Sequence, residues 1–115
     1  MRQLRLTRRP TPAAEAAAAH AWQVLQALPV PVDLPDFAAH AFSERGLRYI
    51  LSIARQYAGS SDFSCAELAT AGHAAAVAAA MRYRTEPGLY EQFAAWWIRQ
   101  GILMKVAGRG LEFSA

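Results

Sequence analysis

Residues 86–115 read Glu-Pro-Gly-Leu-Tyr-Glu-Gln-Phe-Ala-Ala-Trp-Trp-Ile-Arg-Gln-Gly-Ile-Leu-Met-Lys-Val-Ala-Gly-Arg-Gly-Leu-Glu-Phe-Ser-Ala. Pro87 suits the first turn of a helix, which we predict over 87–100 and end at Gly101 as the glycine after its last turn. Two short apolar runs, 102–106 and 111–114, follow on either side of a glycine-containing turn. This pattern predicts a β-hairpin over 102–114.

The predicted helix over 87–100 has distinct faces at helical spacing. Leu89, Phe93, Trp96 and Gln100 mark one face, with Tyr90 and Trp97 flanking it. Because adjacent helical positions diverge by about 100°, Trp96 and Trp97 cannot both point into the centre of one core. The outward positions are expected to be Gly88, Glu91, Gln92, Ala95 and Arg99.

The preceding chain predicts several further helices. Thr11-Pro12 fits a capped helix start, and the alanine-rich run extends to Leu28, where prolines at 29, 31 and 35 stop it and form an extended strap. Asp33, with Asp36 three residues on, is expected to cap a short helix that follows. Residues 43–58 carry the clearest amphipathic pattern, and Gly59 ends it.

A second capped helix is predicted farther along. Ser64-Cys-Ala-Glu67 is a capping-box pattern, in which the serine and the glutamate each satisfy a backbone donor of the first turn. We expect this helix to break or bend near Gly72. A further alanine-rich helix should then run to about Arg84.

Three phrases carry a family resemblance: Ile-Leu-Ser-Ile-Ala-Arg-Gln-Tyr-Ala at 50–58, Phe-Ser-Cys-Ala-Glu-Leu-Ala at 63–69 and Phe-Ala-Ala-Trp-Trp-Ile-Arg-Gln-Gly-Ile-Leu at 93–103. In rhythm they resemble bacterial winged helix-turn-helix regulators over residues 47–115. The resemblance implies a mostly α fold with a C-terminal β-hairpin. It divides the chain into a basic arm (1–10), a helix and proline-rich strap (11–35) and a winged-helix-like domain (36–115). One departure is the extra alanine-rich helix between Ala71 and Leu89.

The same resemblance implies a function in transcription regulation, because the last helix of such proteins enters the major groove and the hairpin reaches the backbone. Gln92 would then pair with adenine, and Arg99 with guanine or phosphate. Lys105 and Arg109 suit a wing on the backbone, whereas Glu86 and Glu91 would repel it. The predicted partner is double-stranded DNA, bound by a homodimer.

The charge distribution adds a second DNA-binding element. Residues 1–10 contain Arg2, Arg5, Arg8 and Arg9 and no acid, so they contribute +4 of charge. Residues 11–115 hold eight basic and nine acidic groups, a balance of −1. The arm is therefore a candidate phosphate tether, or alternatively a solvated terminus.

The sequence offers little chemistry for an enzyme. The three histidines share no metal-ligand spacing with each other or with the single cysteine, Cys65, and no serine lies in a nucleophile elbow. We therefore predict no catalytic residue, no metal and no cofactor. The lone cysteine fits a reducing cytoplasm, and the longest uncharged stretch, residues 16–32, contains two prolines and is too polar to span a membrane.

Two functions stay open at this stage. The first is a small DNA-binding regulator that reads DNA with helix 87–100 and wing 102–114. The alternative is a protein–protein interaction module on the same scaffold, which uses an exposed aromatic face and binds no nucleic acid. The near-neutral body favours the alternative, and the basic arm and wing favour DNA.

Overall fold

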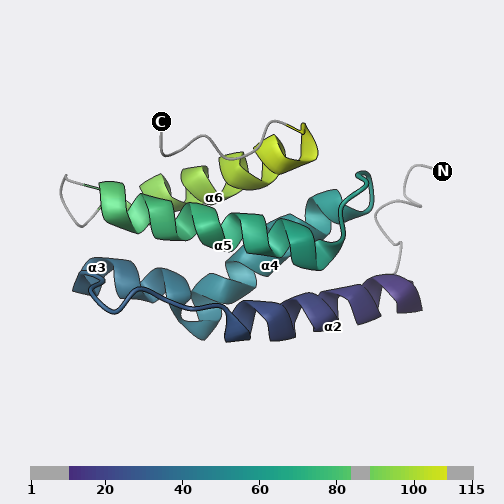
Figure 1. The fold of residues 1–115 in the computed structure, drawn as a ribbon, viewed down its shortest axis with the longest axis horizontal. Helices are drawn as coiled ribbons and strands as arrows, with labels where there is room; N and C mark the ends of the chain where they lie inside the picture. The colour runs from purple at the N-terminus through teal and green to yellow at the C-terminus, as the bar shows by residue number, and fades with distance from the viewer. Residues whose placement is uncertain (1–10, 84–88, 109–115) are drawn as a thin grey trace.

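The computed structural model describes residues 11–83 and 89–108, and these residues form helices and their connections (Figure 1). No strand occurs within these two ranges. In chain order the elements are α2 (Pro12–Ala27), α3 (Asp36–Ala39), the 3₁₀ helix η1 (His40–Phe42), α4 (Glu44–Ala58), α5 (Cys65–Arg82) and α6 (Tyr90–Val106).

Capping side chains begin three of these helices, and two of them, Thr11 and Ser64, are the predicted ones. Thr11 accepts a hydrogen bond from the Ala14 amide at 3.0 Å, with Pro12 in the first turn of α2. Ser43 caps α4 through the Gly46 amide. Ser64 and Glu67 form the predicted capping box of α5, with hydrogen bonds of 3.0 and 2.8 Å to each other's backbone amides. The short helix α3 is also confirmed, although neither aspartate caps it: its first residue is Asp36 and its cap position is Pro35.

Helix α5 lies at the centre of the structure. It packs against α2, α4 and α6, and its contact with α6 is the most extensive (Figure 1). Its buried side chains are mostly methyl groups, so neighbouring helices can approach it closely. The buried residues of α5 are Cys65, Leu68, Ala69, Ala71, Gly72, His73, Ala75, Ala76, Ala79 and Ala80.

Larger apolar side chains from the surrounding helices fill the core against α5. Leu25 of α2, Ile50 of α4 and Ile102 of α6 are each at most 1% exposed and belong to one cluster of buried residues. Helix α2 is therefore part of this core. Arg48 of α4 strengthens its attachment, because the guanidinium lies 4.4 Å from the centre of the Trp22 ring.

Two glycines permit close approaches. A Cβ on Gly46 would collide with the backbone carbonyl of Ala41, so this position lets the start of α4 pack on the turn before it. A Cβ on Gly72 would lie 2.9 Å from the Ile50 side chain and 3.0 Å from that of Ile102. Gly72 thus marks the place where α4 and α6 meet α5.

The predicted C-terminal β-hairpin is wrong. Residues 102–106, expected as its first strand, are the last turns of α6, which runs without interruption through Gly101. The helix ends instead at Val106, and Gly108 two residues later has a φ of +77°, the left-handed conformation that glycine adopts readily. The winged-helix-like fold is therefore overturned, although the predicted second strand, 111–114, lies outside the described residues.

The predicted break near Gly72 is also wrong. Helix α5 continues through this residue as one helix of 18 residues. An interior glycine costs a helix about 1 kcal/mol relative to alanine, and the packing of Ile50 and Ile102 on Gly72 offsets that cost. Across the described ranges, no helix is long and apolar enough to cross a membrane.

His73 makes the stability of this fold pH-dependent. Its side chain is 5% exposed, packs edge-on against Phe42 at 5.3 Å and has no hydrogen-bond partner for Nε2 among the described residues. Burial lowers the pKa of His73 below its ordinary value of 6.5. The unfolded chain therefore takes up a proton at this histidine more readily than the folded chain does.

We expect the free energy of unfolding to fall as the pH drops below about 6.5, since protonation there favours the unfolded state. His73→Leu should flatten this part of the pH profile, whereas the matched change His20→Leu, at an exposed position of α2, should not. Urea denaturation at a series of pH values measures both. If the free energy of unfolding changed with pH by the same slope in the parent chain and in both variants, the pH dependence would not come from His73.

Candidate functional site

Helix α6 has apolar residues on both its inner and its outer side. Its core face consists of Tyr90, Ala94, Ile98, Gly101 and Ile102, all of which are buried. On the opposite side, Leu89 is 56% exposed and Trp96 is 59% exposed. We define the outer face of α6 as the residues Leu89, Gln92, Trp96, Gln100 and Leu103.

The outer face of α6 carries no charge. Gln92 is exposed, and Gln100 and Leu103 are half-buried. A helix at the surface of a soluble domain usually carries charged residues opposite its apolar stripe, and a helix that is apolar all round is usually covered all round. The outer face of α6 therefore has the composition of a surface that packs against another element.

The two tryptophans are divided between the two sides of α6. Trp97 is half-buried, with its ring 5.7 Å from that of Phe93 and 5.6 Å below the guanidinium of Arg82. Trp96 points outward. The two tryptophans therefore do not share one core, as their adjacent positions predict, and Trp96 is the exposed one at 59%.

The predicted DNA-reading residues of α6 do not form one surface. Gln92 is exposed on the outer face. Arg99 is half-buried and donates a hydrogen bond of 3.3 Å to the hydroxyl of Tyr57 at the end of α4. Lys105 is also half-buried, with its ammonium 5.0 Å from the centre of the Phe63 ring. The two cations thus turn toward the protein.

The other predicted DNA contacts are not part of this arrangement. Arg109 and the arm residues Arg2, Arg5, Arg8 and Arg9 lie outside the described residues. Across the described ranges the charges nearly cancel, with six Lys or Arg side chains and seven Asp or Glu side chains.

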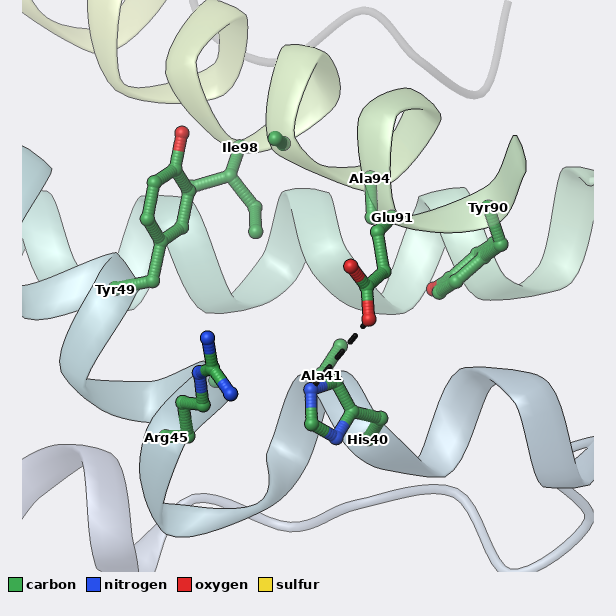
Figure 2. Close-up of a pocket in the computed structure, with 10 residues that line it drawn as sticks. His40, Ala41, Arg45, Tyr49, Tyr90, Glu91, Ala94 and Ile98 are labelled. Atoms are coloured by element: carbon green, nitrogen blue, oxygen red, sulfur yellow. Dashed lines mark ion pairs between the residues drawn. The ribbon is translucent and has the colours of Figure 1, made fainter. Parts of the chain in front are cut away.

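A pocket of about 260 Å³ lies between the start of α4, the preceding turn and the first half of α6 (Figure 2). Its wall is mostly apolar. At one side the His40 imidazole and the Glu91 carboxylate form an ion pair at 3.6 Å, and both are exposed (Figure 2). The lining residues are His40, Ala41, Arg45, Gly46, Tyr49, Tyr90, Glu91, Ala94, Ala95 and Ile98.

Tyr90 is the most buried residue of this pocket at 2% exposure. Its ring packs edge-on against Phe37 at 5.0 Å and Tyr83 at 5.2 Å. Burial raises the pKa of Tyr90, so its hydroxyl stays protonated at neutral pH. Within the described part of the chain that hydroxyl has no hydrogen-bond partner.

The polar side chains around the pocket are those of His40, Arg45, Tyr49, Tyr90 and Glu91. They include no serine or cysteine, and the His40–Glu91 pair lies in solvent, where such pairs contribute little. Cys65 is buried at the start of α5, and desolvation raises its pKa more than the nearby Arg55 lowers it, so the thiol is a weak nucleophile. Among the described residues, no three metal-ligating side chains cluster.

No family model matches this chain, and no similar protein was found among curated proteins or solved structures.

The sequence pattern only partly predicted which side of α6 faces solvent. It grouped Leu89, Phe93, Trp96 and Gln100 on one face, but a pattern of this kind does not distinguish an inner apolar face from an outer one: Leu89 and Trp96 are exposed, whereas Phe93 and Gln100 are half-buried. Of the positions expected to point outward, Glu91 and Gln92 are exposed and Arg99 is half-buried. The sequence also did not single out Arg45 or Tyr49 at the pocket. These side chains meet α6 only through the fold (Figure 2).

The Tyr90 hydroxyl gives a test of this geometry. A buried polar group without a partner destabilises the folded state, so Tyr90→Phe should leave the free energy of unfolding unchanged or raise it by up to about 1 kcal/mol. Chemical denaturation of the two proteins at pH 7 measures the difference. A loss of stability of more than 1 kcal/mol would mean that the hydroxyl has a partner.

Proposed function

We propose that this chain is a protein–protein interaction module that binds its partner through the outer face of α6. The observation that carries the proposal is the exposed Trp96 side chain at the centre of an uncharged helix face. Leu89 and Leu103 lie on the same face, on either side of the tryptophan. Large aromatic residues surrounded by apolar and amide side chains are typical of the centre of protein interfaces.

Trp96 exposes a large apolar surface to water, and covering that surface with a partner would favour binding. Covering the exposed part of this side chain would contribute roughly 3 kcal/mol, because apolar burial yields about 25 cal/mol per Å². A partner would therefore gain a substantial part of its binding energy at one residue. The half-buried Leu103 and the exposed Leu89 extend the apolar surface along the helix.

DNA binding is less well supported than protein binding. It would require a basic surface, and the described residues carry nearly balanced charge. Arg99 and Lys105, the strongest candidates on α6, contact Tyr57 and Phe63. DNA binding through the N-terminal arm stays a prediction, as does the cytoplasmic compartment that the lone, buried Cys65 favours.

Site-specific photo-crosslinking tests the proposed function. We would replace Trp96 by a photoreactive benzophenone amino acid, express the chain in cells and irradiate them. The expected result is an adduct of one discrete mass. The same replacement at Gln23, which is exposed on α2, should give no such adduct because that surface is not part of the proposed interface.

A second change establishes that the adduct depends on the outer face. Leu103→Glu places a charge on the same face, two turns from position 96, and should abolish the adduct. Ser52→Glu adds the same charge at an exposed position of α4 and should leave the adduct intact. An adduct that resists Leu103→Glu, or no adduct at position 96, would contradict the proposal.

A further inference from the structure

We propose that the partner of the outer face of α6 is a second copy of this chain, paired antiparallel with the first so that a two-fold axis passes beside Trp96. This inference rests on the proposed function, since it names the partner of the same surface. It is suggested by a symmetry in the order of side chains along α6.

The outer face of α6 reads the same in both directions from Trp96. Four residues away on either side stand glutamines, Gln92 and Gln100, and seven residues away on either side stand leucines, Leu89 and Leu103. Offsets of four and seven residues return to one side of a helix, because an α-helix makes one turn in 3.6 residues. All five side chains therefore follow one stripe, which the burial pattern places away from the core.

A two-fold axis beside Trp96 makes use of this mirrored order. In such an interface the same surface is used twice: where residue i of one copy meets residue j of the other, residue j of the first meets residue i of the second. With the axis beside Trp96, the two tryptophans adjoin, the Leu89 of each copy lies level with the Leu103 of the other, and Gln92 lies level with Gln100. Glutamine amides both donate and accept hydrogen bonds, so each can pair with another amide.

The charges around the stripe are compatible with this pairing. Two copies bring identical groups close to the axis, where like charges would repel. None of the five residues of the outer face is charged. The nearest cation along the helix, Arg99, borders the stripe, and its hydrogen bond to Tyr57 directs its guanidinium toward α4.

The orientation follows from the same symmetry. A parallel pair would align each residue with itself whatever the sequence, so a mirrored order of side chains has no role in it. In an antiparallel pair about Trp96, that order brings leucine opposite leucine and glutamine opposite glutamine. Antiparallel helices also place opposite ends of their dipoles side by side, whereas parallel helices place like ends together.

The size of the outer face of α6 determines how tightly two copies are expected to bind. Helix α6 has 17 residues and is about 25 Å long, and the apolar groups of its outer face are the exposed Trp96 and Leu89 and the half-buried Leu103. An interface of this extent lies at the lower end of specific interfaces. We therefore expect a reversible dimer with a dissociation constant in the micromolar range.

Sedimentation analysis of the purified chain tests directly whether the partner is a second copy. Over a concentration series spanning the micromolar range, the chain should pass from monomer to dimer. Trp96→Glu should weaken the dimer at least 100-fold, because it places two negative charges at the axis. Gln23→Glu on α2 should dimerise like the parent chain, and Trp96→Ala should show the same weakening if the glutamate variant does not fold.

Cross-linking tests the orientation. In a Cys65→Ser background, we would mix Gln92→Cys with a tagged Gln100→Cys and treat the mixture with a short thiol-specific cross-linker. The antiparallel dimer predicts a product that joins one copy of each kind. Gln92→Cys alone should give little product, since two such positions lie about 12 Å apart along the helix axis.

Several results would overturn the inference. A cross-linked product from Gln92→Cys alone, with no product that joins Gln92→Cys to Gln100→Cys in the mixture, would indicate parallel helices. A chain that stays monomeric at all concentrations would exclude the second copy, and a chain that dimerises only after removal of residues 109–115 would assign the outer face to that segment. A monomeric chain that still forms the photo-adduct at position 96 would retain the proposed function with a different protein as partner.

Discussion

The close approach of three helices to α5 is the constraint on which the rest of this structure depends. The inner surface of α5 is built mostly from alanine methyl groups, with Gly72 among them, so α2, α4 and α6 can lie near its axis while their own larger side chains fill the remaining space. Ile50 and Ile102, both fully buried, meet at Gly72. Because packing in protein interiors is dense, this arrangement fixes the rotation of α6 about its axis.

That rotation decides what α6 offers to solvent. With Ala94, Ile98 and Ile102 directed at the core, Trp96 must point away from it. The apolar outer face is thus a consequence of how α5 receives α6. A charged residue at position 96 would suit a helix face that stays in solvent, and the exposed tryptophan found there is the observation on which the proposed function rests.

Local signals made the helix starts predictable from the sequence. A capping side chain acts within one turn, so Thr11, Ser43 and Ser64 identify their helices without reference to the fold. The glycines were not predictable in this way. Gly72 lies inside a helix where neighbouring side chains pack closely, and Gly101 lies buried inside α6. Gly108 instead follows the end of a helix in the left-handed conformation, and the sequence around these glycines does not separate the two uses.

The candidate site was less predictable than the helices. Arg99 and Lys105 read as free cations because their partners, Tyr57 and Phe63, are more than 40 residues away in the sequence. The order of apolar residues in α6 showed a stripe at Leu89 and Trp96 but not which side of it meets α5. Such information comes only from tertiary packing.

The most direct measurement of the central claim compares two alanines of α5. Ala76 is fully buried against its neighbours, and Ala74 is exposed two residues earlier. If close packing on α5 holds the helices together, Ala76→Leu should reduce the free energy of unfolding by roughly 1–3 kcal/mol and Ala74→Leu by much less. Equal stability of the two variants in urea denaturation would contradict this account.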